Sequence, residues 1–258
     1  MVGNATWGGV RLCDVLKDMG VDRDDKMHVI FVGADTDSNC KHFQLSIPLC
    51  DALDERANIL LAYEMNGEPL SADHGFPLRV IVPGCAGVRS VKWLTQIVLT
   101  NHESTSKIQK QYRVCSPNDT EETEDWKKNS PIHAMPVTSA ICEPVSGDKV
   151  EVGPDGCITV RGYAWSGCGH KIRRVDLSTD GGKSWQQVET TTESESCGQG
   201  HDFAWTLWKA QVPVDKSISG DNLEIWVKAL DSSFNGQPES FESVWNYKGM
   251  LANAYHRV

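Results

Sequence analysis

Short apolar runs that alternate with polar residues cover the chain from residue 138 to residue 258. Side chains that alternate with a period of two fit a strand with one buried face. Residues rich in glycine, proline and aspartate separate the runs, as turns do between strands. The runs are Lys149–Val152, Cys157–Trp165, Ile172–Thr179, Ser184–Glu189, Ala204–Lys209, Leu223–Leu230 and Ser243–Tyr247. A layered all-β unit is the fold that this pattern predicts.

Two further features sharpen this prediction. Asp180-Gly181-Gly182 separates two runs, and glycine supplies the positive φ that a tight hairpin needs. Five tryptophans are candidates for the core: Trp165, Trp185, Trp205, Trp226 and Trp245. About seven short strands with such a core indicate an immunoglobulin-like sandwich.

The first part of the chain, residues 1–112, has a mixed α/β pattern. Val10–Met19 predicts an amphipathic helix, with Gly20 as its C-cap. Asp51–Glu55 predicts a short helix. The expected strands are His28–Val32, Ile59–Tyr63, Leu78–Val82 and Val91–Leu99, and the turn-rich segment Met65–Pro77 is an expected loop.

Residues 113–137 differ from both flanking parts. They contain the acidic stretch Asn118–Asp125 and three prolines, Pro117, Pro131 and Pro136. We interpret them as a connection with a hydrated acidic surface. The sequence thus predicts an α+β chain: a first domain over 1–112, a linker over 113–137, and the all-β domain over 138–258.

Charge and hydropathy exclude several classes of function. The formal net charge of the 258 residues is −10, which argues against nucleic acid or an anionic membrane as partner. No apolar run approaches the ~18 residues of a membrane span. The start of the chain lacks the basic and apolar regions of a signal or transit peptide, so none is expected.

The nine cysteines do not predict a metal site. No CxxC motif occurs. Cys168 with His170, and Cys197 with His201, form two loose cysteine–histidine groups, and their spacing differs from that of common structural zinc sites. We therefore expect loop residues there, and we assign no metal ligand.

Several long segments resemble one enzyme family. The first part contains Leu61–Gly84, with its Asn-Gly…Asp-His-Gly-Phe-Pro…Arg motif, followed by Gly87–Trp93 with its Val-Lys-Trp motif. The second part contains Gly162–Gly167, Ser178–Trp185 and Trp245–Val258. Together and in this order, they resemble the sulfite oxidase family of molybdenum-cofactor enzymes over essentially the whole chain. The resemblance implies a partial molybdopterin-binding domain followed by a dimerisation domain over 138–258.

The resemblance also implies which residues contact the cofactor: Asp35, His74, Arg79, Ser90, Val91 and Lys92. Their chemistry is suitable. Arg79 and Lys92 can donate to the pterin phosphate, and Asp35 can accept from pterin N–H groups. The family often has histidine at the position of Ser90, so we expect a backbone contact there.

Taken singly, these residues have other interpretations. Asp73-His74 in a loop is commonly a turn with a surface imidazole. Arg79 inside an apolar strand commonly pairs with a buried carboxylate, and Lys92 beside Trp93 commonly lies along the surface with its charge in water. The length of the shared motif favours the cofactor interpretation.

The resemblance implies a second group of residues that bind a small oxyanion such as sulfite. Tyr112 matches a substrate tyrosine of the family, and Lys248 stands where the family usually has arginine. Lysine keeps the positive charge but lacks the planar, two-pronged donor geometry of arginine. We therefore expect weaker or altered anion binding at Lys248. An ordinary linker tyrosine is the alternative for Tyr112.

One family feature has no counterpart in these 258 residues. The family's molybdenum-binding cysteine belongs to a Cys-x-Gly-Asn-Arg-Arg-like motif, and none of the nine cysteines lies in such a motif. Cys85 is the nearest similar position. We therefore expect a C-terminal portion of a sulfite oxidase, with an incomplete molybdenum-cofactor site and no activity by itself.

Three hypotheses follow. The first is a portion of a molybdenum-dependent enzyme that oxidises sulfite to sulfate, with an unknown electron acceptor and, by resemblance, a mitochondrial intermembrane location; a cytoplasmic or peroxisomal location is the alternative. The second is a non-catalytic dimerisation or interaction module. The third is part of a nitrate reductase, which Tyr112, Ser116-Pro117 and Met135–Pro144 disfavour.

Overall fold

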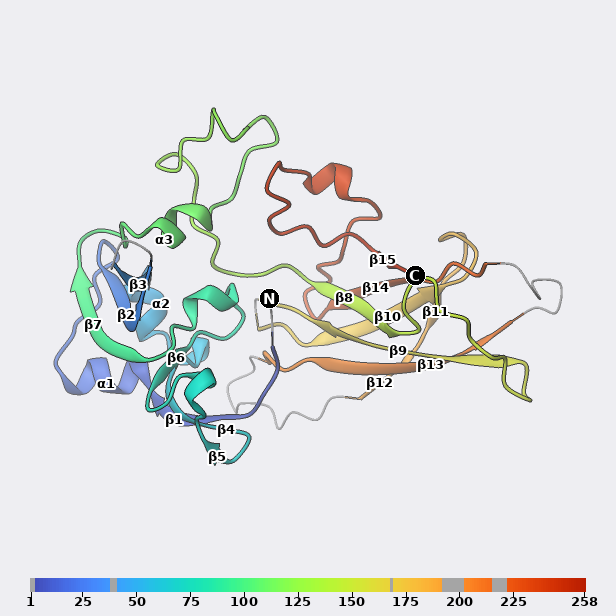
Figure 1. Cartoon of the computed structure of the whole chain (residues 1–258), viewed down its shortest axis with the longest axis horizontal. Helices are drawn as coiled ribbons and strands as arrows, with labels where there is room; N and C mark the ends of the chain where they lie inside the picture. Colours follow the sequence, from blue (N-terminus) through green and yellow to red (C-terminus); the bar gives the residue numbers. More distant parts are fainter. Residues whose placement is uncertain (1–2, 38–40, 168, 192–201, 215–221) are drawn as a thin grey trace. The chain divides into compact units, whose positions relative to one another are not determined.

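A computed structural model describes residues 3–37, 41–167, 169–191, 202–214 and 222–258 (Figure 1). The expected α+β class holds in a coarse form, because the chain is mostly β with a few short helices. The residues form two compact units. The first contains Met1–Met135 and Asn246–Met250, and the second contains Pro136–Trp245 and Leu251–Val258.

The first unit contains two small antiparallel sheets. In one sheet β4 lies between β1 and β5 and also pairs with β6; in the other, β2 lies between β3 and β7. The strands are β1 (Trp7–Arg11), β2 (His28–Thr36), β3 (His42–Pro48), β4 (Leu60–Met65), β5 (Glu68–Pro69), β6 (Arg79–Ile81) and β7 (Leu94–Thr100). The helices are α1 (Leu12–Asp18), α2 (Leu49–Leu53) and α3 (Lys107–Gln111), with 3₁₀ turns η1 (Glu55–Ala57), η2 (Ala72–His74) and η3 (Gly87–Arg89).

One apolar core joins these elements. Phe31 of β2 and Leu45 of β3 are fully buried together with Leu12 of α1. Val91, which follows η3, is 1% exposed and belongs to the same cluster. Because this core reaches Val91, it fixes the start of the segment that carries Lys92.

The predicted helix Val10–Met19 is only partly correct. Helix α1 covers Leu12–Asp18, whereas Val10 belongs to β1, pairs with Leu61 and is 48% exposed. Strand pairing with β4 overrides the helical pattern at this end. The expected C-cap is wrong by one residue, because Met19 is the C-cap and Gly20 follows it with φ +73°.

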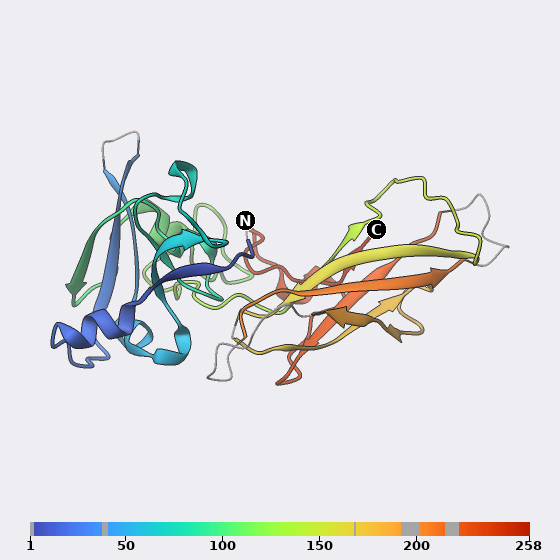
Figure 2. The same cartoon turned by 90° about the horizontal axis from the view of Figure 1, so that it is seen from below.

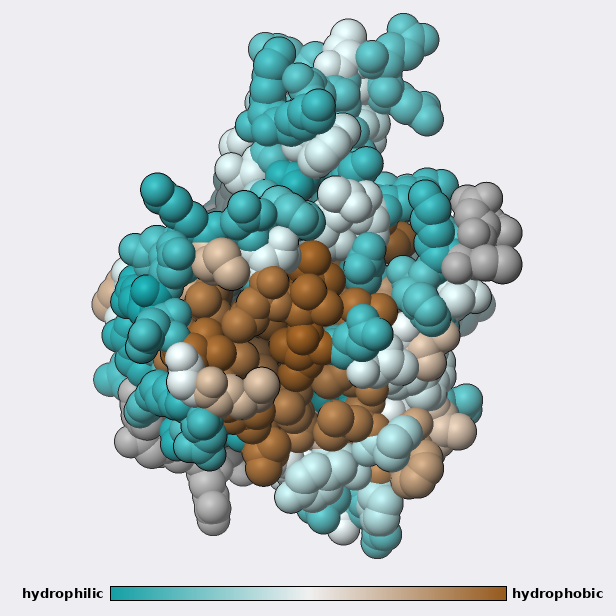
Figure 3. Space-filling view, turned by 90° about the vertical axis from the view of Figure 1, so that its left-hand side faces the viewer, coloured by the Kyte–Doolittle hydropathy of each residue, from teal (hydrophilic) through white to brown (hydrophobic). Residues whose placement is uncertain are grey.

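Apolar side chains gather on one side of the first unit (Figure 3). On the outer side of the sheet β3-β2-β7, a shallow depression of about 390 Å³ is lined by Ile30, Val32, Lys41, His42, Gln44, Gln96 and Val98. Val98 is 40% exposed. Apolar surface of this kind is typical of contacts with another polypeptide.

The second unit contains two antiparallel sheets of four strands each, whose long strands run side by side in Figure 2. The sheet orders are β11-β10-β14-β15 and β12-β13-β9-β8. The strands are β8 (Thr138–Glu143), β9 (Cys157–Trp165), β10 (Ile172–Ser178), β11 (Gln186–Gln187), β12 (Glu189–Thr191), β13 (Thr206–Pro213), β14 (Trp226–Asp231) and β15 (His256–Arg257), and η5 (Phe241–Val244) is a 3₁₀ turn. The immunoglobulin-like connectivity stays a prediction.

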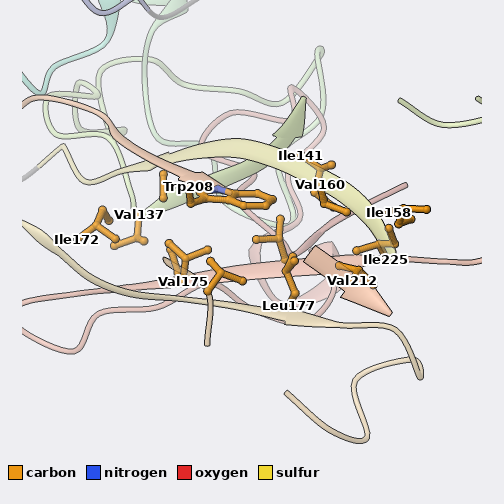
Figure 4. Close-up of a cluster of buried hydrophobic side chains, with 14 residues drawn as sticks. Val137, Ile141, Ile158, Val160, Ile172, Val175, Leu177, Trp208, Val212 and Ile225 are labelled. Atoms are coloured by element: carbon orange, nitrogen blue, oxygen red, sulfur yellow. The ribbon is translucent and has the colours of Figure 1, made fainter. Parts of the chain in front are cut away.

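Both sheets contribute to one core. Figure 4 shows Trp208 and Val160 on one side of this core, and Val175 and Leu177 on the other. Trp208 is 3% exposed, although it was not among the expected core tryptophans. Trp245 was expected in the core but is 46% exposed, because it follows the 3₁₀ turn η5 and no strand includes it.

The strand predictions for this unit are correct for its long strands and wrong at two places. Lys149–Val152 and Ser243–Tyr247 form no strand. Strands β8 and β15 were not predicted. The hairpin is confirmed, because Gly181 and Gly182 have φ of +69° and +80° and β10 pairs with β11.

Two other expectations concern absences. Among the described residues, no helix is long and apolar enough to cross a membrane, and no group of three histidine, cysteine, aspartate or glutamate side chains is arranged to hold a metal ion. Cys168, Cys197 and His201 lie outside the described residues. His170 lies 3.4 Å from the Ser233 hydroxyl through its Nδ1 atom.

Candidate functional site

Asp35 lies near the end of β2, directly after an irregularity in its pairing with β7. The register shifts between Val32 and Gly33. A Cβ atom on Gly33 would lie 2.4 Å from Asp35 Oδ1 and 2.9 Å from the Lys92 carbonyl oxygen. Glycine therefore allows the end of β2 to approach the segment that contains Lys92. Such irregularities often occur next to active sites, where they redirect a side chain.

His74 ends the 3₁₀ turn η2, and its ring is held by a neighbour. Its Nδ1 atom lies 2.7 Å from the Ser71 hydroxyl. The next residue, Gly75, has φ +106°, and a Cβ atom there would meet Lys92 Cβ at 3.0 Å and Arg79 Cβ at 3.2 Å. The turn thus brings Gly75 against Arg79 and Lys92, and the His74 imidazole beside it is exposed, as in a turn with a surface imidazole.

Arg79 begins β6 and donates to two backbone carbonyls. Its Nη1 atom donates to the His74 oxygen at 2.9 Å, and its Nη2 atom donates to the Ser90 oxygen at 3.1 Å. Its guanidinium also lies 4.8 Å from the centre of the Trp7 ring. Burial lowers the pKa of Arg79 from its ordinary value. The alternative of a buried carboxylate partner is wrong, because these carbonyls and the Trp7 ring surround the guanidinium.

Ser90, Val91 and Lys92 follow η3. The Ser90 hydroxyl accepts from the Val82 amide at 3.1 Å, and the Val91 oxygen accepts from the Val80 amide at 2.8 Å. Lys92 Nζ donates to the Asp73 oxygen at 2.8 Å and lies 4.4 Å from the Trp93 ring centre. Because the Val91 side chain is buried in the core, its backbone is what a ligand could contact.

Two polar atoms in this group have no hydrogen-bond partner although they are buried: Asp35 Oδ1 and Arg79 Nε. One is an acceptor and the other is a donor. Buried polar groups are normally paired, so each such atom requires an explanation. A ligand that offers both N–H groups and anionic oxygens satisfies them, and molybdopterin offers both. The residues present therefore fit the cofactor.

Tyr112 and Lys248 are held by different neighbours within the first unit. Tyr112 follows α3, and its backbone pairs with Ile108 and Ile132. Lys248 Nζ donates to Glu124 Oε1 at 2.6 Å. Among the described residues, no hydrogen bond joins the Tyr112 and Lys248 side chains, so the structure does not unite them as directly as it unites the six cofactor candidates.

Sequence reasoning missed Arg89, although it directly precedes Ser90. Its side chain is fully buried. Its Nε atom donates to the Ile132 oxygen at 2.8 Å, and its Nη1 atom donates to the Ser46 oxygen at 2.7 Å and to Gln109 Oε1 at 3.0 Å. Burial lowers its pKa. Arg89 thus links the Ser90–Lys92 segment to β3, α3 and the chain beside Tyr112. An arginine in an otherwise apolar run was the available signal.

Sequence reasoning also missed Glu124, which was expected to belong to a hydrated acidic surface. Its side chain is only 14% exposed. Burial opposes its charged form, but hydrogen bonds from Lys248 and Tyr247 outweigh burial and lower its pKa. A turn in which the Glu124 amide donates to the Thr120 oxygen at 3.0 Å carries the carboxylate inward. No sequence signal distinguished it from its acidic neighbours.

Comparison with known proteins defines the class to which this fold and site belong. Residues 1–108 match the model of the oxidoreductase molybdopterin binding domain, and residues 129–258 match that of the Mo-co oxidoreductase dimerisation domain. The chain therefore contains two domains of molybdopterin-dependent oxidoreductases, and molybdopterin is the cofactor that these domains imply.

Individual relatives narrow this class. The mitochondrial sulfite oxidase of Drosophila melanogaster is 54% identical over all of this chain and 45% of its own length. The nitrate reductase of Hordeum vulgare is 34% identical over 100% of the chain and 30% of its own length. The chain belongs to the sulfite oxidase family.

A solved structure agrees with this membership. The sulfane dehydrogenase SoxCD of Paracoccus pantotrophus matches with a TM-score of 0.72 and 26% identity, over 91% of this chain and 54% of that chain. The chain spans about half the length of the sulfite oxidase it matches.

Proposed function

We propose that this chain forms part of a sulfite oxidase, in which it holds the molybdenum cofactor and one side of the substrate site. The reaction would convert sulfite and water to sulfate, two electrons and two protons. The observation that carries the proposal is the pair of buried, unpartnered atoms Asp35 Oδ1 and Arg79 Nε beside the Ser90–Lys92 segment. When bound, molybdenum in the cofactor supplies the two-electron redox chemistry.

Each cofactor candidate has a role that its contacts support. Asp35 accepts hydrogen bonds from pterin N–H groups. Arg79 and Lys92 donate to anionic oxygens of the cofactor, and a backbone amide near Ser90 or Val91 adds a further donor. His74, with Nδ1 at Ser71, offers Nε2 to the ligand. Gly33 and Gly75 permit the close approach of these segments.

We propose that Tyr112 and Lys248 contact the oxyanion. Lys248 supplies positive charge, and the Tyr112 hydroxyl can donate a hydrogen bond to an anionic oxygen. These groups bind and orient sulfite. They do not themselves accept the electrons, for which the acceptor is unknown.

We further propose that the chain by itself does not oxidise sulfite. The resemblance assigns the molybdenum thiolate to a cysteine motif that none of the nine cysteines provides. A soft thiolate is a preferred ligand of such metals. A non-catalytic dimerisation or interaction module is therefore the second candidate, and sulfite-dependent reduction of ferricyanide by the chain would overturn it. The lower identity to nitrate reductase disfavours the third candidate.

The remaining proposals concern assembly and location. We propose that residues 1–112 bind the cofactor, that residues 113–137 connect the domains, and that residues 138–258 form a homodimer. The mitochondrial relative supports a mitochondrial location, and the intermembrane space is the finer proposal. Fractionation of mitochondria with an antibody against this chain tests it, and signal confined to another compartment would contradict it.

Cofactor binding can be measured without enzyme turnover. The chain is produced in cells that make molybdopterin, and bound pterin is quantified by the fluorescence of its oxidised form. We expect Asp35→Asn and Arg79→Met to lose most of the pterin. The controls Asp25→Asn and Arg23→Met change the same residue types at exposed positions, where the side chains are 73% and 71% exposed.

The controls should retain pterin at the level of the unchanged chain. Absence of pterin from the unchanged chain, or full retention in both Asp35→Asn and Arg79→Met, would contradict the proposed cofactor site. Circular dichroism on each variant separates loss of ligand from loss of fold.

A further inference from the structure

Glu124 forms an ion pair with Lys248, the residue whose positive charge binds the substrate in the proposed function. Its Oε1 atom accepts from Lys248 Nζ at 2.6 Å, and its Oε2 atom accepts from the Tyr247 hydroxyl at 2.7 Å. The Cys115 thiol lies 3.6 Å from Oε1. Both carboxylate oxygens therefore have partners in the first unit.

The surroundings strengthen this pair. The side chains of Lys248 and Glu124 are 18% and 14% exposed. Water screens charges less at such positions than at the surface. Burial opposes the charged form of Lys248, but its hydrogen bond to Glu124 outweighs burial and raises its pKa. The ammonium and the carboxylate therefore stay charged and paired near neutral pH.

The backbone holds both partners in place. Asn246 and Met250 exchange hydrogen bonds across the turn that carries Tyr247 and Lys248, at 2.8 Å and 3.0 Å. The turn from Thr120 fixes Glu124 from the other side. The Glu124 carboxylate is thus held in place beside Lys248, whereas the neighbouring Glu121 and Glu122 are exposed.

We propose that Glu124 competes with the oxyanion for Lys248 and thereby weakens anion binding at this position. This inference rests on the proposed role of Lys248. An ammonium has three donors, so an oxyanion can reach it while one donor is used. The two negative charges then repel each other across a few ångströms. Binding of an oxyanion to Lys248 therefore weakens the Lys248–Glu124 ion pair. For this reason Glu124 lowers the affinity of Lys248 for anions.

The test measures sulfate binding to the chain by isothermal titration calorimetry. Glu124→Gln keeps the shape and the hydrogen-bonding capacity of the side chain but removes its charge. We expect it to bind sulfate about tenfold more tightly than the unchanged chain, which corresponds to about 1.4 kcal/mol. Glu122→Gln removes the same charge at an exposed position, and we expect a change of less than twofold.

A second pair of variants separates this inference from the function on which it rests. Lys248→Met as a single substitution should reduce the affinity for sulfate. The same substitution added to Glu124→Gln should reduce it more strongly. If Lys248→Met weakens binding but Glu124→Gln equals the unchanged chain, the competition by Glu124 is wrong and the role of Lys248 stands. If Lys248→Met has no effect in either background, the proposed anion site itself is wrong.

A measurement on the unchanged chain avoids dependence on folding of the variants. Sulfate should shift the side-chain carboxyl ¹³C resonance of Glu124 and the ¹⁵Nζ resonance of Lys248 along the same saturation curve. A Lys248 resonance that moves while that of Glu124 stays fixed would overturn the competition.

Discussion

At Gly33 and Gly75 the backbone passes so close to other segments that a side chain would not fit. The cofactor candidates come from separate parts of the sequence, and these approaches bring them together. Lys92 is among the close neighbours at both positions, through its backbone at Gly33 and through its Cα and Cβ atoms at Gly75. The absence of a Cβ atom is therefore as important to the candidate site as its charged groups.

Gly33→Ala tests this requirement. The new methyl group would lie 2.4 Å from Asp35 Oδ1, so Asp35 or the Lys92 backbone must move. We expect a loss of about 1–3 kcal/mol in the free energy of unfolding and a loss of bound pterin. Gly3→Ala is the control, because nothing lies within 4 Å of its Cβ position. Pterin binding by Gly33→Ala equal to that of Gly3→Ala would show that the close approach is not needed.

His133 predicts a dependence of stability on pH. Burial, with a smaller contribution from Arg89, lowers the pKa of His133 to about 4. In the unfolded chain the value is about 6.5, so between these two pH values the unfolded chain binds more protons. The contribution of neutral His133 to the free energy of unfolding is therefore complete above about pH 6.5, and it is lost as the pH falls towards 4.

Urea unfolding at pH 7 and at pH 4.5 measures this effect. Between pH 7 and pH 4.5 the free energy of unfolding should decrease in the unchanged chain more than in His133→Gln. We expect the two decreases to differ by on the order of 1–3 kcal/mol. His42→Gln replaces an exposed histidine and should keep the full pH dependence. Identical pH dependence in His133→Gln and the unchanged chain would assign the effect to other groups.

Three elements of the first unit meet at one buried side chain. Arg89 connects η3, β3 and α3, and its Nε atom also donates to the Ile132 carbonyl oxygen. The Ile132 amide in turn donates to the Tyr112 oxygen at 3.0 Å. The Arg89 guanidinium thereby positions the Ser90–Lys92 segment relative to the segment that carries Tyr112.

Arg89→Met should destabilise the first unit by about 2–4 kcal/mol, because the Ile132 and Ser46 carbonyls lose their buried donors. Arg89→Lys should not restore stability, since one ammonium cannot reproduce the planar fork. Hydrogen exchange of amides in β3 and α3 under urea reports this unit separately. Arg23→Met, at a side chain that is 71% exposed, should change stability by less than about 0.5 kcal/mol. Equal protection in Arg89→Met and Arg23→Met would contradict the role of Arg89.

At the scale of the whole molecule, the two units present different surfaces. The second unit matches a dimerisation domain, whereas the first exposes the apolar depression beside Val98. Both are candidates for contact with another polypeptide. Two copies that each carry a net charge of −10 repel each other. A dimer therefore requires a specific contact that outweighs this repulsion.

Sedimentation equilibrium tests the dimer. We expect a mass twice the 28.5 kDa of one chain at micromolar concentration. Mixing isotope-labelled and unlabelled chains before cross-linking identifies links between copies, and we expect them at lysines of the second unit such as Lys183 or Lys209. Links between copies at Lys41 of the depression would instead place the contact on the first unit, and a monomer would contradict the dimerisation proposal.

The sequence by itself determined the two-part organisation, the long strands of the second unit and the family. These features depend on local periodicity, on turn residues and on long contiguous motifs, all of which can be read along the chain. The family resemblance also indicated Asp35, His74, Arg79 and Lys92, which lie around Gly33 and Gly75.

Only the tertiary structure decided how the charges are used. Glu124 has the same chemistry as Glu122, but one turn carries it inward to Lys248. Arg89 lies in an apolar run, and its partners are 43 and 20 residues away in the sequence. Val10 fits a helix but joins a strand because β4 lies beside it. Burial and long-range pairing determine these outcomes, and neither is visible in a local pattern.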